Sequence, residues 1–201
     1  MSSREFMGFR LVGGTALSLK LGHRISVDID LFSDVTYGGI NFTAINNFVE
    51  NTFAFSNHLS ALSPALGKSY SVGKSEESSV KLDVYYTDPF IRPVLVEDDI
   101  RMVAIEEIVA MKIDVVQRGG RKKDFWDLHE LLDTFSISSM LALHEERYPY
   151  NHDEGAILKN FTTFTLADED FDPICLRGKF WQFIKDDIAR AVQTYLTENA
   201  G

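Results

Sequence analysis

The sequence predicts an α/β or α+β fold, in which a core of strands and helices is followed by a helical C-terminal part. Short strand-like segments alternate with helical patterns before residue 88, and mostly helical patterns follow residue 104. The pairs Asp88-Pro89 and Arg92-Pro93 mark turns between the two regions. We therefore expect a core over residues 1–100 and a helical part over residues 101–201 that packs on it.

The individual elements follow from local signals. Phe9–Val12 is a short apolar run that predicts a strand. Residues 28–32 and 80–87, in which polar and apolar side chains alternate, predict two more strands. Residues 54–74 predict a strand and a turn. Gly22 ends a helix over residues 15–21, and a second helix is predicted over residues 43–53. In the second half, helical periodicity covers residues 104–118, 123–135, 137–147, 153–163 and 178–198.

Composition excludes several classes of protein. No apolar run approaches the roughly 18–20 residues of a transmembrane helix, and the N-terminus lacks the apolar stretch of a signal peptide, so we expect a cytoplasmic protein. The net charge of −10 argues against a broad nucleic-acid-binding surface. The single Cys175 excludes an internal disulfide and is interpreted as a core residue or an inert thiol. The five histidines lack the spacing of zinc ligands.

Three aspartates suggest a metal site. Asp28 and Asp30 are two residues apart on a predicted strand, so their side chains share one face. Asp83 lies on a second strand, opposite the apolar face formed by Val80, Leu82 and Val84. Three carboxylates on one sheet face have the oxygen ligands that bind two Mg²⁺ ions and support phosphoryl-type transfer. The alternative is that these are ordinary solvated strand residues.

Gly13, Gly14 and Thr15 lie between the first predicted strand and the following helix. The free N–H groups and positive dipole of a helix N-terminus bind phosphate, and glycine permits a close approach of the backbone. This turn is therefore a candidate nucleotide-binding site, although a plain structural turn has the same pattern.

Lys112 and Asp124 lie on the apolar faces of two successive predicted helices. Lys112 follows Ile105 and Ile108 at helical spacing, and Leu128 and Leu131 follow Asp124 in the same way. One interpretation is a buried ion pair that joins the helices. The other is a site in which Lys112 neutralises phosphate charge and Asp124 orients or deprotonates an acceptor.

A local basic segment lies between these helices. Arg118, Arg121 and Lys122 are interpreted either as a solvated turn or as a grip on phosphates, with Lys123 next to them. Lys123 and Asp127 are four residues apart, which predicts a surface ion pair on a helix.

Three runs, Leu11–Leu17, Gly22–Phe32 and Arg118–Leu128, resemble the AbiEii/AbiGii nucleotidyltransferases of abortive-infection and toxin–antitoxin systems. The resemblance implies a polymerase-beta-like nucleotidyltransferase core with a mixed sheet. It implies metal binding by Asp28, Asp30 and Asp83. It also implies catalytic roles for Asp28, Asp30, Lys112 and Asp124, and nucleotide binding by Gly13, Gly14, Thr15, Arg118 and Lys123.

The function expected from this resemblance is Mg²⁺-dependent transfer, with Mn²⁺ as a substitute. The protein would move a nucleoside monophosphate from an NTP to a hydroxyl of RNA (a tRNA 3′ end) or of a protein. A toxin or phage-defence role and a cognate antitoxin are expected with it, and no membrane partner. The alternative is a catalytically silent protein of the same fold that binds a nucleotide or a partner.

Overall fold

The computed structural model describes residues 1–59 and 66–199 of the chain. Contacts divide the chain into two compact units. Unit 1 comprises Met1–Ala16 and Ser26–Ala104, and unit 2 comprises Leu17–Ile25 and Ile105–Gly201. The chain thus enters the second unit briefly, within helix α1 (Gly13–Leu21), before it completes the first.

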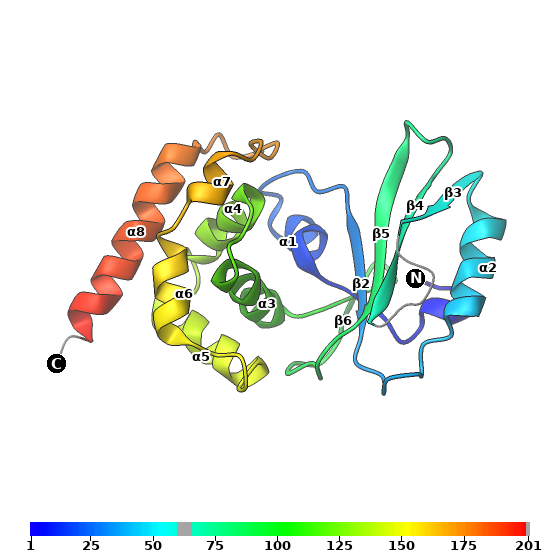
Figure 1. Cartoon of the computed structure of the whole chain (residues 1–201), viewed down its shortest axis with the longest axis horizontal. Coiled ribbons are helices and arrows are strands. Elements are labelled where there is room, and N and C mark those ends of the chain that lie inside the picture. The colour runs from blue at the N-terminus through cyan, green and yellow to red at the C-terminus, as the bar shows by residue number, and fades with distance from the viewer. Residues whose placement is uncertain (60–65, 200–201) are drawn as a thin grey trace. The chain divides into compact units, whose positions relative to one another are not determined.

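The strands of unit 1 form one mixed sheet, which within the described residues has seven strands in the order β3-β4-β5-β2-β1-β7-β6 (Figure 1). β2 pairs in parallel with β5, and β1 pairs in parallel with β7, while the other neighbouring pairs are antiparallel. The strands are β1 (Arg10–Leu11), β2 (Ile29–Ser33), β3 (Phe55–His58), β4 (Gly67–Gly73), β5 (Ser79–Tyr86), β6 (Leu95–Glu97) and β7 (Ile100–Met102). The mixed sheet confirms the predicted α/β class.

The core of unit 1 follows from alternation along its longer strands. On β5, Leu82 and Val84 are buried, whereas Lys81 is exposed and Asp83 is half-buried. Helix α2 (Phe42–Thr52) buries Ile45 and Val49 and lies near β3 and β4 (Figure 1). The 3-10 helix η1 (Arg4–Phe6) packs against α2, with the Phe6 and Phe48 rings 5.3 Å apart. The strand face opposite this core therefore remains available for polar residues.

The hairpin of β6 and β7 was not predicted from the sequence. Its strands have three residues each, and Glu97 pairs with Ile100 across a two-residue turn. Both turn residues, Asp98 and Asp99, have positive φ (49° and 60°). Aspartate tolerates this conformation, which tight hairpin turns require. Part of the predicted 54–74 segment, residues 60–65, lies outside the described residues.

Unit 2 is helical after residue 104, as predicted. Helix α3 contacts α4, α5 and α6, and α8 contacts α4, α5 and α6 (Figure 1). α3 is buried along most of its length because Ile108, Val109, Ile113 and Val116 are inaccessible to solvent. The helices are α3 (Ile105–Gln117), α4 (Lys122–Leu131), α5 (Ile137–Arg147), α6 (Glu154–Phe161), the short α7 (Thr165–Asp168) and α8 (Trp181–Glu198). Among the described residues, none of the helices has the length and apolar character that a membrane span requires.

Candidate functional site

The first candidate site is the carboxylate cluster of unit 1, which we define as Asp28, Asp30 and Asp83 with Lys81. Asp30 and Asp83 face each other directly across the parallel β2–β5 pair. Residues in register on neighbouring strands project to the same face about 5 Å apart. Asp28 directly precedes β2, two residues before Asp30. The sheet therefore brings together carboxylates that are more than 50 residues apart in the chain.

Lys81 lies among these carboxylates. Its Nζ atom is 2.6 Å from Oδ2 of Asp83, and the two residues are on the same face of β5. Burial lowers the pKa of Lys81, but the hydrogen bond and the charge of Asp83 outweigh that effect. The negative charges of Asp30 and Asp28 raise the pKa further above its ordinary value. All three acids therefore act on one ammonium group.

The donor set of the cluster fits a hard divalent cation. Carboxylate oxygens are the ligands that Mg²⁺ prefers, and Oδ1 of Asp83 is buried with no hydrogen-bond partner in the structure. A buried acceptor without a partner is costly, and a bound cation would satisfy it. Within residues 1–59 and 66–199, however, no three acidic, histidine or cysteine side chains already surround a single ion position. Metal binding by Asp28, Asp30 and Asp83 stays a prediction.

The glycine turn lies against this cluster. Gly13 has φ +68°, and a Cβ atom built on it would lie 2.7 Å from Oδ2 of Asp30. The N–H of Val12 donates to the carbonyl of Asp30 at 2.9 Å. Glycine is therefore required here both by the backbone conformation and by the close approach of a carboxylate. The first turn of α1, with Gly13 and Gly14, consequently starts directly beside Asp30.

Thr15 fixes the segment that leads into Asp28. Its hydroxyl donates to the carbonyl oxygen of Asp28 and lies 2.9 Å from the Ser26 hydroxyl. The predicted nucleotide-binding turn and the predicted metal ligands are thus adjacent within unit 1. Whether Gly13, Gly14 and Thr15 bind a nucleotide stays a prediction.

The second candidate site is the buried ion network of unit 2, formed by His23, Arg24, Lys112, Asp124 and Asp127. The Lys112 ammonium lies 2.7 Å from Oδ1 of Asp124 and 2.6 Å from Oδ2 of Asp127. The Lys112 and Asp124 side chains are each only 7% exposed. The ion pair between α3 and α4 that the sequence suggested is therefore present, and the catalytic roles of Lys112 and Asp124 stay predictions.

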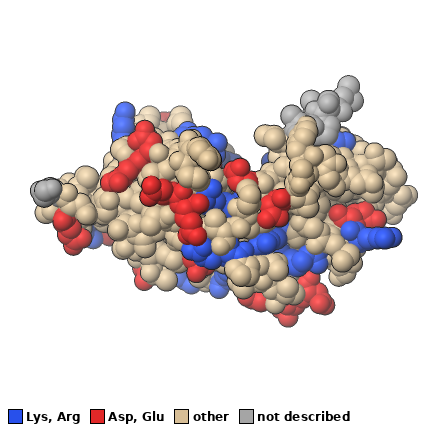
Figure 2. All heavy atoms as spheres, turned by 90° about the horizontal axis from the view of Figure 1, so that it is seen from below, with Lys and Arg blue, Asp and Glu red and all other residues tan. Residues whose placement is uncertain are grey.

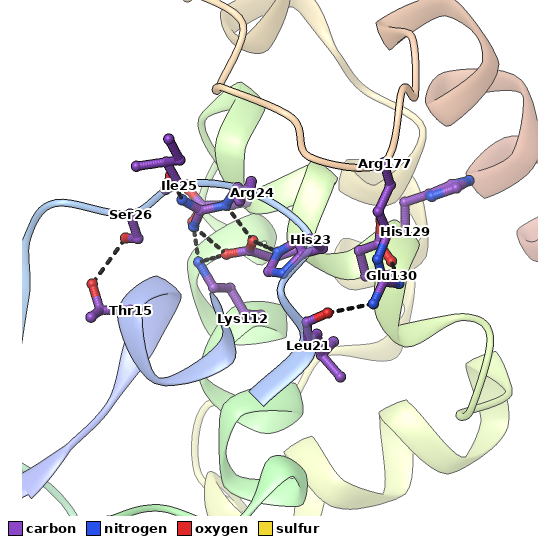
Figure 3. A network of polar contacts seen from close by, with 12 residues as sticks. Thr15, Leu21, His23, Arg24, Ile25, Ser26, Lys112, His129, Glu130 and Arg177 are labelled. Carbon is purple, nitrogen blue, oxygen red and sulfur yellow. Dashed lines mark hydrogen bonds and ion pairs between the residues drawn. The ribbon is translucent and has the colours of Figure 1, made fainter. Parts of the chain in front are cut away.

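Asp127 is the centre of the network, because His23, Arg24 and Lys112, which are labelled in Figure 3, all contact it. Arg24 donates to it through Nε (2.6 Å to Oδ1) and Nη2 (2.8 Å to Oδ2), and Nε2 of His23 lies 2.8 Å from Oδ1. Burial raises the pKa of Asp127, but the charge of Lys112 and the Arg24 hydrogen bonds hold it well below the ordinary value. Burial lowers the pKa of Lys112, but the charges of Asp127 and Asp124 raise it above the ordinary value.

The predicted surface pair of Lys123 and Asp127 is wrong, because the Asp127 side chain is fully buried. Asp127 follows Asp124 by three residues, so the two carboxylates share one helix face. Besides Lys112, Asp127 contacts His23 and Arg24, which lie about 100 residues earlier in the chain. Helical spacing alone could have placed Asp127 beside Asp124, but it could not identify these partners.

Asp124 also caps helix α4. Its Oδ2 atom accepts the N–H of Arg121 at 3.0 Å, while Oδ1 accepts the Lys112 ammonium. A carboxylate in the first turn of a helix satisfies a free N–H group and interacts favourably with the helix dipole. Both oxygens of Asp124 thus already have structural roles.

The basic segment is largely neutralised by acidic residues of the same unit. Arg118 pairs with Asp114, and Arg121 lies 3.1 Å from Asp170. The Lys122 ammonium is 2.9 Å from Asp172. On the face shown in Figure 2, Lys and Arg atoms likewise adjoin Asp and Glu atoms. These pairs favour a structural turn, and nucleotide binding by Arg118 and Lys123 stays a prediction.

Comparison with known proteins shows the family and the fold of the chain. The family model described as nucleotidyl transferase AbiEii toxin, type IV toxin–antitoxin system, matches residues 2–198. An uncharacterized protein of Aquifex aeolicus is 27% identical over 199 residues, which cover 94% of this chain and 88% of that protein.

Two solved structures show the same fold. One is a putative nucleotidyltransferase from H. pylori, with a TM-score of 0.63, 18% identity, and coverage of 96% of this chain and 88% of that chain. The other is MenT4, a nucleotidyltransferase toxin of Mycobacterium tuberculosis, with a TM-score of 0.55, 13% identity, and coverage of 92% and 75%. The nucleotidyltransferase fold predicted from the sequence is confirmed.

Proposed function

The chain belongs to the AbiEii family of nucleotidyl transferase toxins of type IV toxin–antitoxin systems, and from this premise we propose that it transfers a nucleoside monophosphate from an NTP to a hydroxyl acceptor and releases pyrophosphate. The observation that carries the proposal is the register of the β2–β5 pair. It sets Asp30 beside Asp83, with the glycine turn of α1 against Asp30.

In this proposal, Asp28, Asp30 and Asp83 hold Mg²⁺. The bound metal would neutralise triphosphate charge and polarise the phosphorus that is attacked. The N-terminal N–H groups of α1 bind phosphate oxygens, and Gly13 permits their close approach. The Thr15 hydroxyl donates to the backbone carbonyl oxygen of Asp28. In this proposal the hydroxyl therefore positions the Asp28 carboxylate and does not itself react.

Two residues of unit 2 complete the proposal on the strength of the family resemblance. Lys112 would stabilise phosphate charge, and Asp124 would orient the acceptor hydroxyl. The acceptor is a hydroxyl of RNA, with a tRNA 3′ end as the first candidate, or of a protein. A cognate antitoxin that restrains the toxin is part of the same proposal.

The test is transfer of label from each α-³²P-NTP with Mg²⁺ to total tRNA and to a cell extract. We expect one NTP to label an RNA or protein band, and digestion with RNase or protease to identify which. Asp30→Asn should abolish the label. Asp99→Asn is the matched control, since Asp99 is exposed in the β6–β7 turn and asparagine also tolerates its positive φ. Equal labelling by wild type and Asp30→Asn would refute the metal site.

The toxin role has a separate readout. Induced expression in a bacterial host that lacks the cognate antitoxin should arrest growth, and Asp30→Asn should relieve the arrest while Asp99→Asn does not. Growth arrest by Asp30→Asn at equal protein level would show that toxicity does not require the proposed chemistry.

One observation favours a second candidate, a protein that binds a nucleotide without transfer. Both oxygens of Asp124 are already occupied, by Lys112 and by the Arg121 N–H. This candidate predicts Mg²⁺-dependent thermal stabilisation by NTP that disappears in Asp30→Asn, with no labelled product from any acceptor. Detection of a labelled acceptor that depends on Asp30 would exclude it.

A further inference from the structure

Lys81 is a cation in direct contact with one of the proposed metal ligands, Asp83. It precedes Asp83 by two residues on β5, so both side chains project from the same face of the strand. Its ammonium contacts Oδ2 of Asp83 at 2.6 Å, and its charge interacts with Asp30 and Asp28. The ammonium therefore occupies the neighbourhood in which a cation bound by these acids would lie.

The two partners of this ion pair differ in mobility and exposure. The Lys81 side chain is 45% exposed, whereas the Asp83 side chain is 16% exposed. A long, half-exposed lysine can turn its ammonium into water at little cost, but a largely buried carboxylate on a central strand stays in place. Asp83 also keeps Oδ1 without a hydrogen-bond partner while Oδ2 binds Lys81. Oδ1 of Asp83 can therefore accept a further ligand, while Oδ2 contacts a lysine ammonium that is able to move away.

We propose that Lys81 is a resident counter-ion of the carboxylate cluster, and that divalent metal binds by displacing its ammonium from Asp83. This inference rests on the proposed metal site. An ammonium and a divalent cation within a few ångströms repel each other, so a lysine that stays near the acids weakens metal binding. Lys81 also reduces repulsion among the three carboxylates when no metal is bound. Lys81 thereby keeps the metal-free cluster folded and lowers its affinity for free metal.

The test is titration with Mn²⁺, a paramagnetic substitute for Mg²⁺, followed by electron paramagnetic resonance of the free ion without nucleotide. Removing the neighbouring positive charge in Lys81→Met should lower the dissociation constant of Mn²⁺ by about tenfold. Lys81→Arg keeps the charge and should bind Mn²⁺ no more tightly than wild type. Circular dichroism verifies that each variant is folded.

Lys74→Met is the matched control, because it removes the same charge from the same unit. Lys74 is exposed in the turn beyond Gly73 and Ser79, which pair at the far end of the β4–β5 hairpin. The four residues from Ser79 to Asp83 span roughly 13 Å of strand, more than the screening length of about 8 Å at physiological salt. Lys74→Met should therefore leave the Mn²⁺ affinity unchanged.

Thermal unfolding gives a readout that does not depend on the resonance signal. Without metal, Lys81→Met should melt below Lys74→Met because the carboxylates then repel one another. Mn²⁺ should raise the melting temperature of Lys81→Met more than that of wild type, since the variant binds the ion more tightly.

The outcomes separate this inference from the proposed function. If Lys81→Met binds Mn²⁺ no more tightly than Lys74→Met, Lys81 is not a competitor and the inference is overturned. If the double variant Lys81→Met/Asp30→Asn binds Mn²⁺ as tightly as Lys81→Met, the ion does not bind at this cluster and the proposed metal site fails. A tightened site that is lost with Asp30→Asn supports both.

Discussion

Asp83 of unit 1 and Asp127 of unit 2 each accept a lysine ammonium at 2.6 Å, yet their surroundings differ. Around Asp83, three carboxylates act on one lysine, the lysine is half-exposed, and one buried oxygen lacks a partner. Around Asp127, two carboxylates face Lys112 and Arg24, and every one of these charged side chains is buried. A cluster with excess negative charge favours an external cation, whereas a balanced one stabilises the fold.

The largest effect that can test this contrast is expected at Asp127. Asp127→Asn should lower the free energy of unfolding by about 3–5 kcal/mol, because it leaves buried cations without their shared counter-ion. Urea unfolding measures the change. Asp133→Asn, an exposed aspartate just beyond α4, is the control and should stay within about 0.5 kcal/mol of wild type. An Asp127→Asn protein as stable as Asp133→Asn would show that the buried ion network does not stabilise unit 2.

The same network predicts the pH dependence of stability. The pKa of Asp127 lies below its ordinary 3.8, so its contribution is complete above about pH 4 and is lost as pH falls further. The pKa of Lys112 lies above its ordinary 10.5, so its contribution is complete below about pH 10 and is lost as pH rises further. The urea concentration at the midpoint of unfolding should therefore decrease below about pH 4 and above about pH 10.

Variants isolate the acid side of this profile. The urea midpoint of Asp127→Asn should be lower than that of wild type at neutral pH. Below about pH 4 it should decline less than the wild-type midpoint, because the titrating carboxylate is absent. Asp133→Asn should follow the wild-type profile. Parallel acid declines in Asp127→Asn and wild type would assign the acid sensitivity to other groups.

An intermediate effect is expected at Asp124. Asp124→Asn leaves Asp127 to neutralise Lys112, and the amide oxygen can still accept one hydrogen bond, so the loss of stability should be about 1–3 kcal/mol. The proposed role adds a second expectation: labelled transfer should fall at least a hundredfold in a variant that is still folded. Full activity in Asp124→Asn would limit this residue to the structural role.

The ease of prediction differed between the two regions for a physical reason. Helical spacing is local, so the sequence alone placed Lys112 and Asp124 on facing stripes of adjacent helices, and the structure pairs them at 2.7 Å. Strand alternation likewise predicted that Asp28 and Asp30 share one face, and in the structure Asp28 directly precedes β2 while Asp30 lies within it. The adjacency of Asp30 and Asp83 was only a hypothesis before the strand order was known, because parallel pairing joins distant segments.

Long-range polar contacts were not predictable. Nothing near Asp127 indicates that His23 and Arg24 contact it, since such contacts depend on the tertiary fold. The proposed role of Lys81 was not predicted from the sequence for a different reason. Its i, i+2 relation to Asp83 is visible in the sequence, but the number of acids that share its charge is not. The β6–β7 hairpin was missed because three-residue strands have too little pattern.

A loss of stability similar to that at Asp124 is expected where the glycine turn meets the cluster. Gly13→Ala combines a positive φ with a Cβ atom 2.7 Å from Asp30 Oδ2, so we expect a loss of about 1–3 kcal/mol. Gly38→Ala is the matched control, since Gly38 has φ +87° but no atom within 4 Å of its Cβ position. The difference between the two variants measures the contact with Asp30. Equal losses would mean that backbone strain explains the whole effect and that Asp30 moves away freely.

The smallest effect on stability is expected at Arg118. Its side chain is 64% exposed and pairs with Asp114 one helical turn earlier, so Arg118→Gln should change the free energy of unfolding by less than about 0.5 kcal/mol. The variant therefore tests nucleotide binding without disturbing the fold. If Arg118 grips phosphate, stabilisation by Mg²⁺-NTP should weaken several-fold relative to Arg190→Gln, whose arginine is 73% exposed and pairs with Asp187 on α8. Identical NTP binding by the two variants would leave Arg118 as a neutralised surface charge and confine the nucleotide-binding prediction to the glycine turn and Lys123.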